Sequence, residues 1–131
     1  MTHHPAISAG RTAVITGAAS GIGLAAAERF QSLGMNVVMA DNNGVALKAE
    51  FDRLRGSNEG KVEAIEVDVS SPTDVLRLRD QAFQAFGEVS VLMNNAGIEP
   101  ATPALKASDA WARVMQINLG AVDDAPQVDL H

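Results

Sequence analysis

Residues 12–23 read TAVITGAASGIG and place three glycines directly after a β-branched run. The run Thr12–Thr16 has the composition of a buried strand, because Thr, Val and Ile favour the extended backbone. Apolar residues then recur from Ile22 to Leu33 at helical spacing, and Gly34 supplies the stop. This stretch therefore predicts a strand, a tight glycine-rich loop and a helix.

Three further apolar runs follow, and segments with helical spacing separate them. We predict strands at 37–40, 62–67 and 89–93, and helices at 44–55 and 72–86. Right-handed helical crossovers between parallel strands produce a doubly wound sheet. The sequence thus predicts an α/β protein with a partial doubly wound Rossmann fold, about four parallel strands in the order 3-2-1-4 and flanking helices. Its ligand crevice is expected between the first and fourth strands.

The C-terminal part of the chain divides at Asp123. A last helix is predicted to begin at Ser108, and its apolar stripe includes Trp111 and Met115. From Asp123 onward the sequence is acidic and has neither helical nor alternating periodicity. We therefore expect an incomplete Rossmann domain over 1–122 and a disordered acidic tail over 123–131.

Composition and charge exclude several classes of function. The chain has 131 residues, a formal net charge of -6 and no cysteine. A nucleic-acid-binding protein would need a basic surface, and a membrane protein would need an apolar run of about 20 residues. The three histidines, His3, His4 and His131, lie at the chain ends and are not expected to form a metal site. We expect a cytoplasmic protein that binds neither nucleic acid, membrane nor metal.

The glycines have the spacing of a dinucleotide-binding loop. Gly17, Gly21 and Gly23 would allow chain reversal, close approach of a pyrophosphate and tight helix packing. The amino end of the following helix would supply N–H donors to the phosphates. Asp41 stands 18 residues after Gly23, where a carboxylate can accept the adenosine ribose hydroxyls. It would repel a 2'-phosphate, so NAD is expected over NADP, although Asp41 could also be an ordinary turn residue before Asn42.

These residues resemble the short-chain dehydrogenase/reductase family, whose fingerprint is Thr-Gly-x-x-x-Gly-x-Gly. Asp41, Asp68-Val69, Asn94–Gly97 and Asn118 are further matches, and the resemblance covers residues 11 to about 122. It implies a cofactor site made by Gly17, Ser20, Gly21, Ile22, Gly23, Asp41, Asp68, Val69, Asn95, Ala96 and Gly97.

The resemblance also suggests individual roles. Asp68 would hold the adenine amino group with Val69 packing near the ring, or it could be a strand-end turn aspartate. Asn95, Ala96 and Gly97 would line the floor beneath the cofactor ribose. Asn118 would be the family's catalytic asparagine, which helps hold a water near the catalytic lysine, or it could be bonded within its own helix.

The residues that complete the family's chemistry do not occur in this sequence. The family transfers a proton through a tyrosine whose pKa a lysine four residues later lowers. The chain has no tyrosine, and its lysines, Lys48, Lys61 and Lys106, all precede Asn118. We interpret it as the cofactor-binding half of an NAD-dependent oxidoreductase for an alcohol/carbonyl pair, truncated before Tyr-x-x-x-Lys. A frameshift, a gene fragment and a deliberate truncation are the possible causes. It is predicted to be inactive alone, with a small-molecule substrate only in a complete relative. The alternative is a non-catalytic nucleotide-binding or interaction module.

The predicted sheet would also be unfinished. In the family a fifth strand lies beside strand four, so we expect the strand at 89–93 to have an exposed edge and to drive self-association. For the same reason Trp111 and Met115 are expected to lack the neighbours that would complete their burial.

Overall fold

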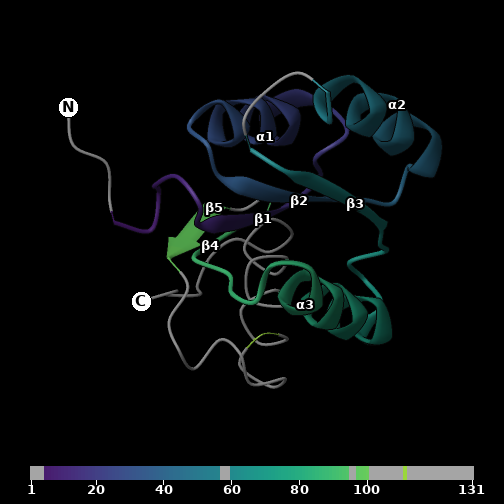
Figure 1. Ribbon diagram of the computed structural model, residues 1–131. Helices are drawn as coiled ribbons and strands as arrows, with labels where there is room; N and C mark the ends of the chain where they lie inside the picture. The colour runs from purple at the N-terminus through teal and green to yellow at the C-terminus, as the bar shows by residue number, and fades with distance from the viewer. Residues whose placement is uncertain (1–4, 57–59, 95–96, 101–110, 112–131) are drawn as a thin grey trace.

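The computed structural model describes residues 5–56, 60–94, 97–100 and 111 (Figure 1). Strands and helices alternate along the chain in this order: β1 (Thr12–Thr16), α1 (Gly21–Ser32), β2 (Asn36–Asp41), α2 (Gly44–Leu54), β3 (Val62–Glu66), α3 (Pro72–Phe86), β4 (Val91–Asn94) and β5 (Gly97–Pro100). The first seven elements are those expected from the sequence, and their ends lie within two residues of the predicted ones. The helix expected from Ser108 and the tail 123–131 lie outside the described residues, apart from Trp111.

The parallel part of the sheet has the expected order, β3-β2-β1-β4. Strand β1 is central: Ile15 pairs with Met39 of β2 on one side and with Met93 of β4 on the other. The chain winds outward through β2 and β3, then returns across β1 to form β4. The order therefore reverses beside β1, and in open α/β sheets ligands bind at the carboxyl ends of the strands at such a point.

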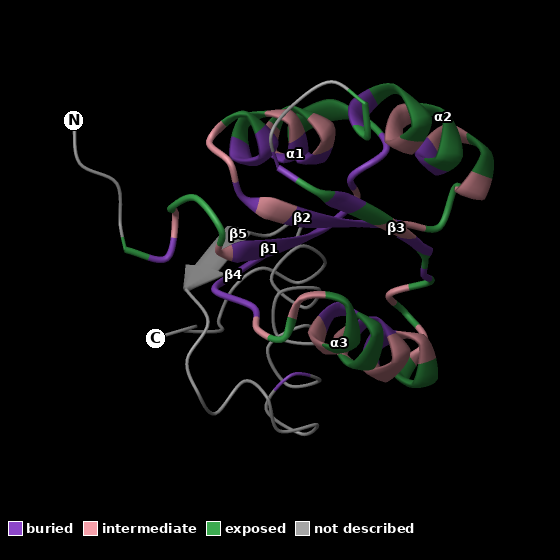
Figure 2. Cartoon of the chain, viewed as in Figure 1, coloured by how far each residue is buried: buried purple, intermediate pink, exposed green. Residues whose placement is uncertain are grey.

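Helices cover both faces of the sheet. Figure 1 shows α1 and α2 on one face and α3 on the other. Alternate side chains of each strand enter the two cores: Ile15 and Met39 pack beneath α1 and α2, whereas Val14 and Val38 pack towards α3. Burial on both faces explains why these strands are continuous apolar runs (Figure 2).

Two residues cap the ends of α3, Ser71 at its start and Gly87 at its end. The Ser71 hydroxyl accepts a hydrogen bond from the backbone N–H of Asp74 at the start of α3. At the end of this helix Gly87 has φ = 81°, in the left-handed region that favours glycine. Both residues satisfy polar groups that a helix end leaves without intrahelical partners.

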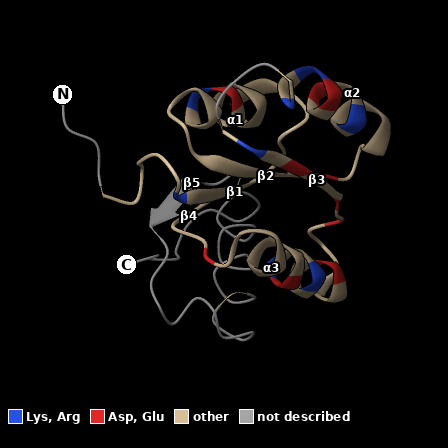
Figure 3. Ribbon diagram, in the orientation of Figure 1, with Lys and Arg blue, Asp and Glu red and all other residues tan. Residues whose placement is uncertain are grey.

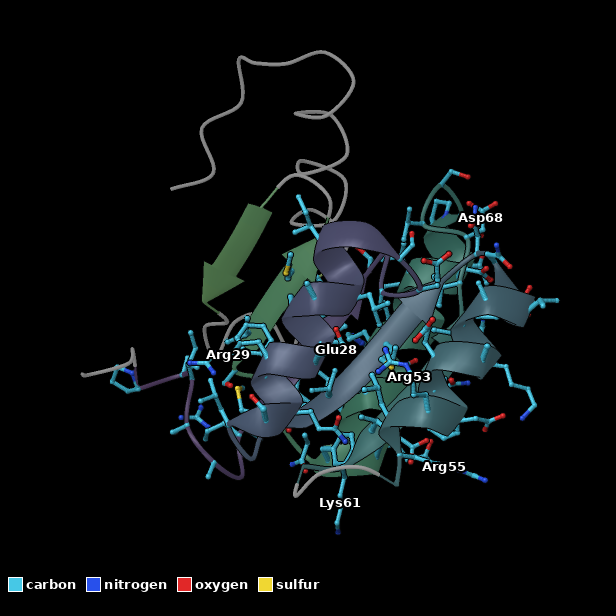
Figure 4. The ribbon with its side chains drawn as sticks, turned by 90° about the horizontal axis from the view of Figure 1, so that it is seen from above. Glu28, Arg29, Arg53, Arg55, Lys61 and Asp68 are labelled. Carbon is cyan, nitrogen blue, oxygen red and sulfur yellow. The ribbon has the colours of Figure 1, made fainter. Side chains whose placement is uncertain are left out.

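Charged residues belong mainly to the three helices and to the edge strand β3 (Figure 3). Arg53 of α2 joins α1 to α2, because its guanidinium lies 2.8 Å from Glu28 and 2.7 Å from Glu50. Figure 4 shows Glu28 and Arg53 facing each other across the two helices. None of the helices in the described part of the chain is long and apolar enough to cross a membrane.

Strand β5 corrects one expectation. It pairs antiparallel with β4, with Met93 opposite Ile98, so the edge of β4 is occupied and the prediction that it is exposed was wrong. The sequence did not indicate this strand, because it has only four residues and contains both Gly97 and Pro100, which are unfavourable in strands. An unpaired β4 therefore no longer supports self-association.

Trp111 corrects a second expectation, because its side chain is fully buried. Its ring meets that of Phe83 edge to face, with centroids 6.2 Å apart. The indole Nε1–H donates to the carbonyl oxygen of Val75 at 3.0 Å. Helix α3 thus supplies the neighbours that were expected to be missing, and the polar atom of the indole is paired as burial requires.

We predict that Trp111→Ala lowers the free energy of unfolding by about 3–5 kcal/mol, the usual cost of emptying a buried aromatic site. Trp111→Phe should cost much less, because most of the ring volume stays and only a hydrogen bond worth about 1 kcal/mol is lost. Urea unfolding followed by far-ultraviolet circular dichroism measures both. Equal stability of Trp111→Ala and the unmutated chain would contradict the packing described.

Candidate functional site

Three segments singled out in the sequence meet at one end of the sheet. Gly17 directly follows β1, Asp41 is the last residue of β2, and Asp68 lies two residues beyond β3. These strands are parallel and adjacent, so their carboxyl ends share one edge of the sheet. Figure 4 shows Asp68 beyond one end of β3 and Lys61 at the other. This edge is therefore the candidate site.

The glycine-rich loop has the geometry that its glycines were predicted to provide. Gly17 and Gly21 have φ values of 69° and 58°, which residues with a side chain rarely adopt. A Cβ atom on Gly23 would lie 2.1 Å from the carbonyl oxygen of Gly17. Only glycine at position 23 therefore lets the first turn of α1 pack directly against the loop.

Helix α1 has neither a side-chain cap nor an acidic residue at its amino end. Ser20 is the N-cap residue, but its side chain makes no capping hydrogen bond. The first turn of the helix contains no acidic residue. The helix therefore has no acidic side chain within its own first turn to interact with the positive end of its dipole, which favours an anionic ligand there.

Ile22 corrects the predicted apolar stripe of α1. Its side chain is 80% exposed, although the sequence pattern placed it in the core. The buried stripe begins one residue later and runs through Gly23, Ala27 and Phe30. Ile22 consequently presents a large apolar side chain next to the glycine-rich loop, where it is free to contact a ligand.

The carboxylate of Asp41 lies between the loop and the end of β2. Its Oδ2 accepts a hydrogen bond from the backbone N–H of Ala19 at 3.0 Å, and its Oδ1 accepts one from the N–H of Asn43 at 2.9 Å. The bond from Asn43 is local and agrees with the alternative interpretation of Asp41 as a turn residue. The first places the carboxylate beside the loop, and each oxygen still has acceptor capacity for a ligand.

Asp68 makes a local turn. Its Oδ1 accepts hydrogen bonds from the Ser70 hydroxyl at 2.6 Å and from the Ser70 N–H at 2.9 Å. Both bonds favour the charged form of the Asp68 carboxyl and so hold its pKa below the ordinary value. The bond from the Ser70 hydroxyl has the larger effect. Val69 is half-buried against the α3 side of the core. These contacts are those of a strand-end turn aspartate. The role of Asp68 in holding the adenine amino group stays a prediction.

A hollow of about 660 Å³ adjoins these residues, and its lining includes Asn42, Glu66, Asp68, Asp74 and Arg77. Its charged lining is three acids and one arginine. The Arg77 guanidinium is engaged, since it donates to the Glu66 carbonyl at 2.7 Å and lies 3.5 Å from the Asp74 carboxylate. The sequence did not indicate that Asp74 and Arg77 reach this end of the sheet, because they belong to α3.

Several predicted site residues are not placed. Asn95, Ala96 and Asn118 lie outside the described residues. Gly97 begins β5, where its backbone pairs with that of Asn94. Within the described part of the chain, no three His, Asp or Glu residues come together as a metal site would need.

The pattern of the family described as "short chain dehydrogenase" matches residues 11–125. A 3beta-hydroxysteroid dehydrogenase 2 of Eggerthella lenta is 41% identical over 122 residues, which are 92% of this chain and 46% of that protein. The chain therefore spans less than half the length of this curated relative.

Two solved structures share the fold. A short chain dehydrogenase/reductase from Burkholderia phymatum in complex with NAD has a TM-score of 0.62 and 45% identity, over 66% of this chain and 30% of that one. The L-sorbose reductase of Gluconobacter frateurii, complexed with NADPH and L-sorbose, has a TM-score of 0.65 and 30% identity. The match covers 87% of this chain and 46% of that one.

We predict that Gly23→Ala lowers the free energy of unfolding by about 3 kcal/mol, the upper end of overpacking costs, because its Cβ would meet a backbone carbonyl that cannot rotate away. Gly21→Asn is the matched control. Nothing lies within 4 Å of a Cβ at Gly21, and Asn tolerates its positive φ, so a loss below about 1 kcal/mol is expected. Chemical unfolding of the two variants tests this, and similar losses would contradict the close approach.

Proposed function

Because the chain belongs to the short-chain dehydrogenase/reductase family, we propose that it binds NAD across the carboxyl ends of β1 and β2. We propose further that it forms the cofactor-binding part of an oxidoreductase acting on an alcohol/carbonyl pair. The observation that carries this is the close approach of Gly23 to Gly17, which places the amino end of α1 at the carboxyl end of β1, beside Asp41. NAD, when bound, would supply the hydride acceptor.

The pyrophosphate is the ligand group best matched to the loop. Gly17, Ser20, Gly21 and Gly23 surround the amino end of α1, where N–H groups and the helix dipole attract an anion. No side chain on the glycines obstructs a close approach of the phosphates. The exposed Ile22 offers an apolar surface to the part of the dinucleotide beyond the pyrophosphate.

The proposed preference for NAD over NADP rests on local charge. Relatives in this family are described in complex with NAD and with NADPH, so membership alone does not choose between them. Asp41 would accept the ribose hydroxyls and oppose a 2'-phosphate. The neighbouring hollow adds the carboxylates of Glu66, Asp68 and Asp74, and its one arginine is already hydrogen-bonded. A 2'-phosphate would find no unengaged cation among the residues that line this hollow.

The remaining roles are proposed from the resemblance. Asp68 would accept the adenine amino group, and Val69 would pack near the ring. Asn95, Ala96 and Gly97 would lie beneath the cofactor ribose, and Asn118 would serve as the catalytic asparagine. The loop around Asp68 is compatible with this role, because its carboxylate is charged, exposed and retains a second oxygen.

A second candidate function is nucleotide binding without catalysis. It is favoured by the composition of this polypeptide, which contains no tyrosine and no lysine after Lys106. Oxidation of an alcohol requires a group that accepts the hydroxyl proton as the hydride leaves. With that group absent, these 131 residues would bind the dinucleotide and perform no redox chemistry by themselves.

We predict that NAD binds at least about tenfold more tightly than NADP, since two unit charges 4 Å apart repel by about 4 kcal/mol at an effective dielectric near 20, before screening by salt. Asp41→Ala should remove most of this preference. Asp52→Ala removes the same charge from an exposed position on α2 and is the control. Isothermal calorimetry with both cofactors measures the ratio, and equal affinities in the unmutated chain would contradict the role of Asp41.

We also predict that the purified 131-residue chain does not reduce NAD with any of a broad panel of alcohols. General acid–base catalysis alone contributes about 100- to 10,000-fold, and the tyrosine that would provide it is missing. NADH formation is followed by its absorbance against a heat-denatured control. Steady formation above that control would reject the second candidate function.

A further inference from the structure

Two consecutive amides tie the glycine-rich loop to the end of β2. The N–H of Ala18 donates to the backbone carbonyl of Ala40 at 3.1 Å, and the N–H of Ala19 donates to Oδ2 of Asp41 at 3.0 Å. The first bond is available to any residue at position 40. The second depends on the side chain at position 41, 22 residues away from Ala19 in the sequence.

The Asp41 carboxylate is itself held in place. Its other oxygen accepts from the N–H of Asn43, and the Asn43 side chain caps α2 by accepting from the N–H of Ala46 at 3.1 Å. The hydrogen-bonded connection therefore runs from the loop through Asp41 to the start of α2. Because both oxygens are bonded, the rotamer of Asp41 is restricted from two sides.

The loop needs such an anchor because of its composition. Gly17 and Gly21 both have positive φ, and glycine loses more conformational freedom on becoming ordered than any other residue. A loop that is ordered before the ligand arrives spares the ligand that entropic cost, so affinity rises. Ala18 and Ala19 lie between the two glycines, where hydrogen bonds restrict the loop most directly.

We propose that Asp41 is the positioning residue of the glycine-rich loop: its bond to Ala19 orders the phosphate-binding backbone, in addition to any contact with the ribose. This deepens the proposed nucleotide-binding function and rests on it. The consequence is that Asp41 affects the affinity for a diphosphate ligand even when that ligand has no ribose hydroxyl to offer.

The first test needs no ligand. Amide hydrogen exchange measured by NMR should be faster at Ala19 by about tenfold or more in Asp41→Ala, as expected for loss of a hydrogen bond to a charged acceptor. The Ala18 amide, whose acceptor is a backbone carbonyl, should change far less. Asp68→Ala removes a strand-end carboxylate that bonds only locally to Ser70 and should leave Ala19 exchange unchanged. Unchanged exchange at Ala19 in Asp41→Ala would overturn the proposal.

The second test uses 2',3'-dideoxy-ADP, which keeps the diphosphate and lacks both ribose hydroxyls. Calorimetry in about 0.5 M salt limits the gain that removing a negative charge would give an anionic ligand. Asp41→Ala should bind this ligand several-fold more weakly than the unmutated chain, with Asp52→Ala as the control. Equal or tighter binding by Asp41→Ala would show that Asp41 contacts the ribose only.

Failure of the proposed function is distinguishable from failure of this inference. If the unmutated chain binds no nucleotide, the binding proposal is rejected, while Ala19 exchange still decides whether Asp41 orders the loop. If Asp41→Ala does not fold, Asp41→Asn provides the test, because its side-chain oxygen can still accept the bond but carries no charge. Ala19 exchange should then be faster than in the unmutated chain, since hydrogen bonds to a charged acceptor are stronger than those to a neutral one. Unchanged Ala19 exchange in Asp41→Asn would overturn the proposal.

Discussion

The contact between Gly23 and the carbonyl oxygen of Gly17 is the constraint on which the site and much of the core depend. A Cβ at position 23 would lie 2.1 Å from that oxygen, so α1 can begin against the end of β1 only because the side chain is absent. This placement turns the buried stripe of α1 onto the sheet through Ala27 and Phe30. The same turn places the amino end of the helix at the carboxyl end of β1. The packing of α1 and the position of the candidate site thus follow from one close approach.

Much of the fold could be predicted because its determinants are local. β1 and β2 are buried on both faces and therefore form unbroken apolar runs in the sequence. The ends of α3 are marked by the hydroxyl of Ser71 and by the positive φ of Gly87. β5 was missed because its pairing with β4 depends on a reversal of the chain that no periodicity records. The burial of Trp111 was missed for a similar reason, since its partners lie on α3, far away in the sequence.

Some features of the candidate site could likewise be predicted from the sequence, and others could not. Gly17, Gly21, Gly23 and Asp41 were predictable because a strand–loop–helix–strand unit sets both their spacing and their common position at one sheet edge. The bond from the Ala19 amide to Asp41 could not be predicted, because every residue except proline has such an amide and the sequence carries no mark of its use. Asp74 and Arg77 lie in the first two turns of α3, which follows β3 closely, but their contacts with the Asp68 amide and the Glu66 carbonyl belong to the tertiary structure and leave no mark in the sequence.

Asp41 combines two demands that oppose each other electrostatically. A carboxylate beside the loop would repel the phosphates that the loop is proposed to bind, yet its two amide partners, Ala19 and Asn43, compensate part of that charge. A neutral residue at position 41 would relieve the repulsion and release Ala19 at the same time. The proposed selection against a 2'-phosphate and the proposed ordering of the loop would therefore be linked through one side chain. A change of cofactor preference made at this position would need a new acceptor for the Ala19 amide, supplied either by the replacement residue or by the ligand phosphate itself.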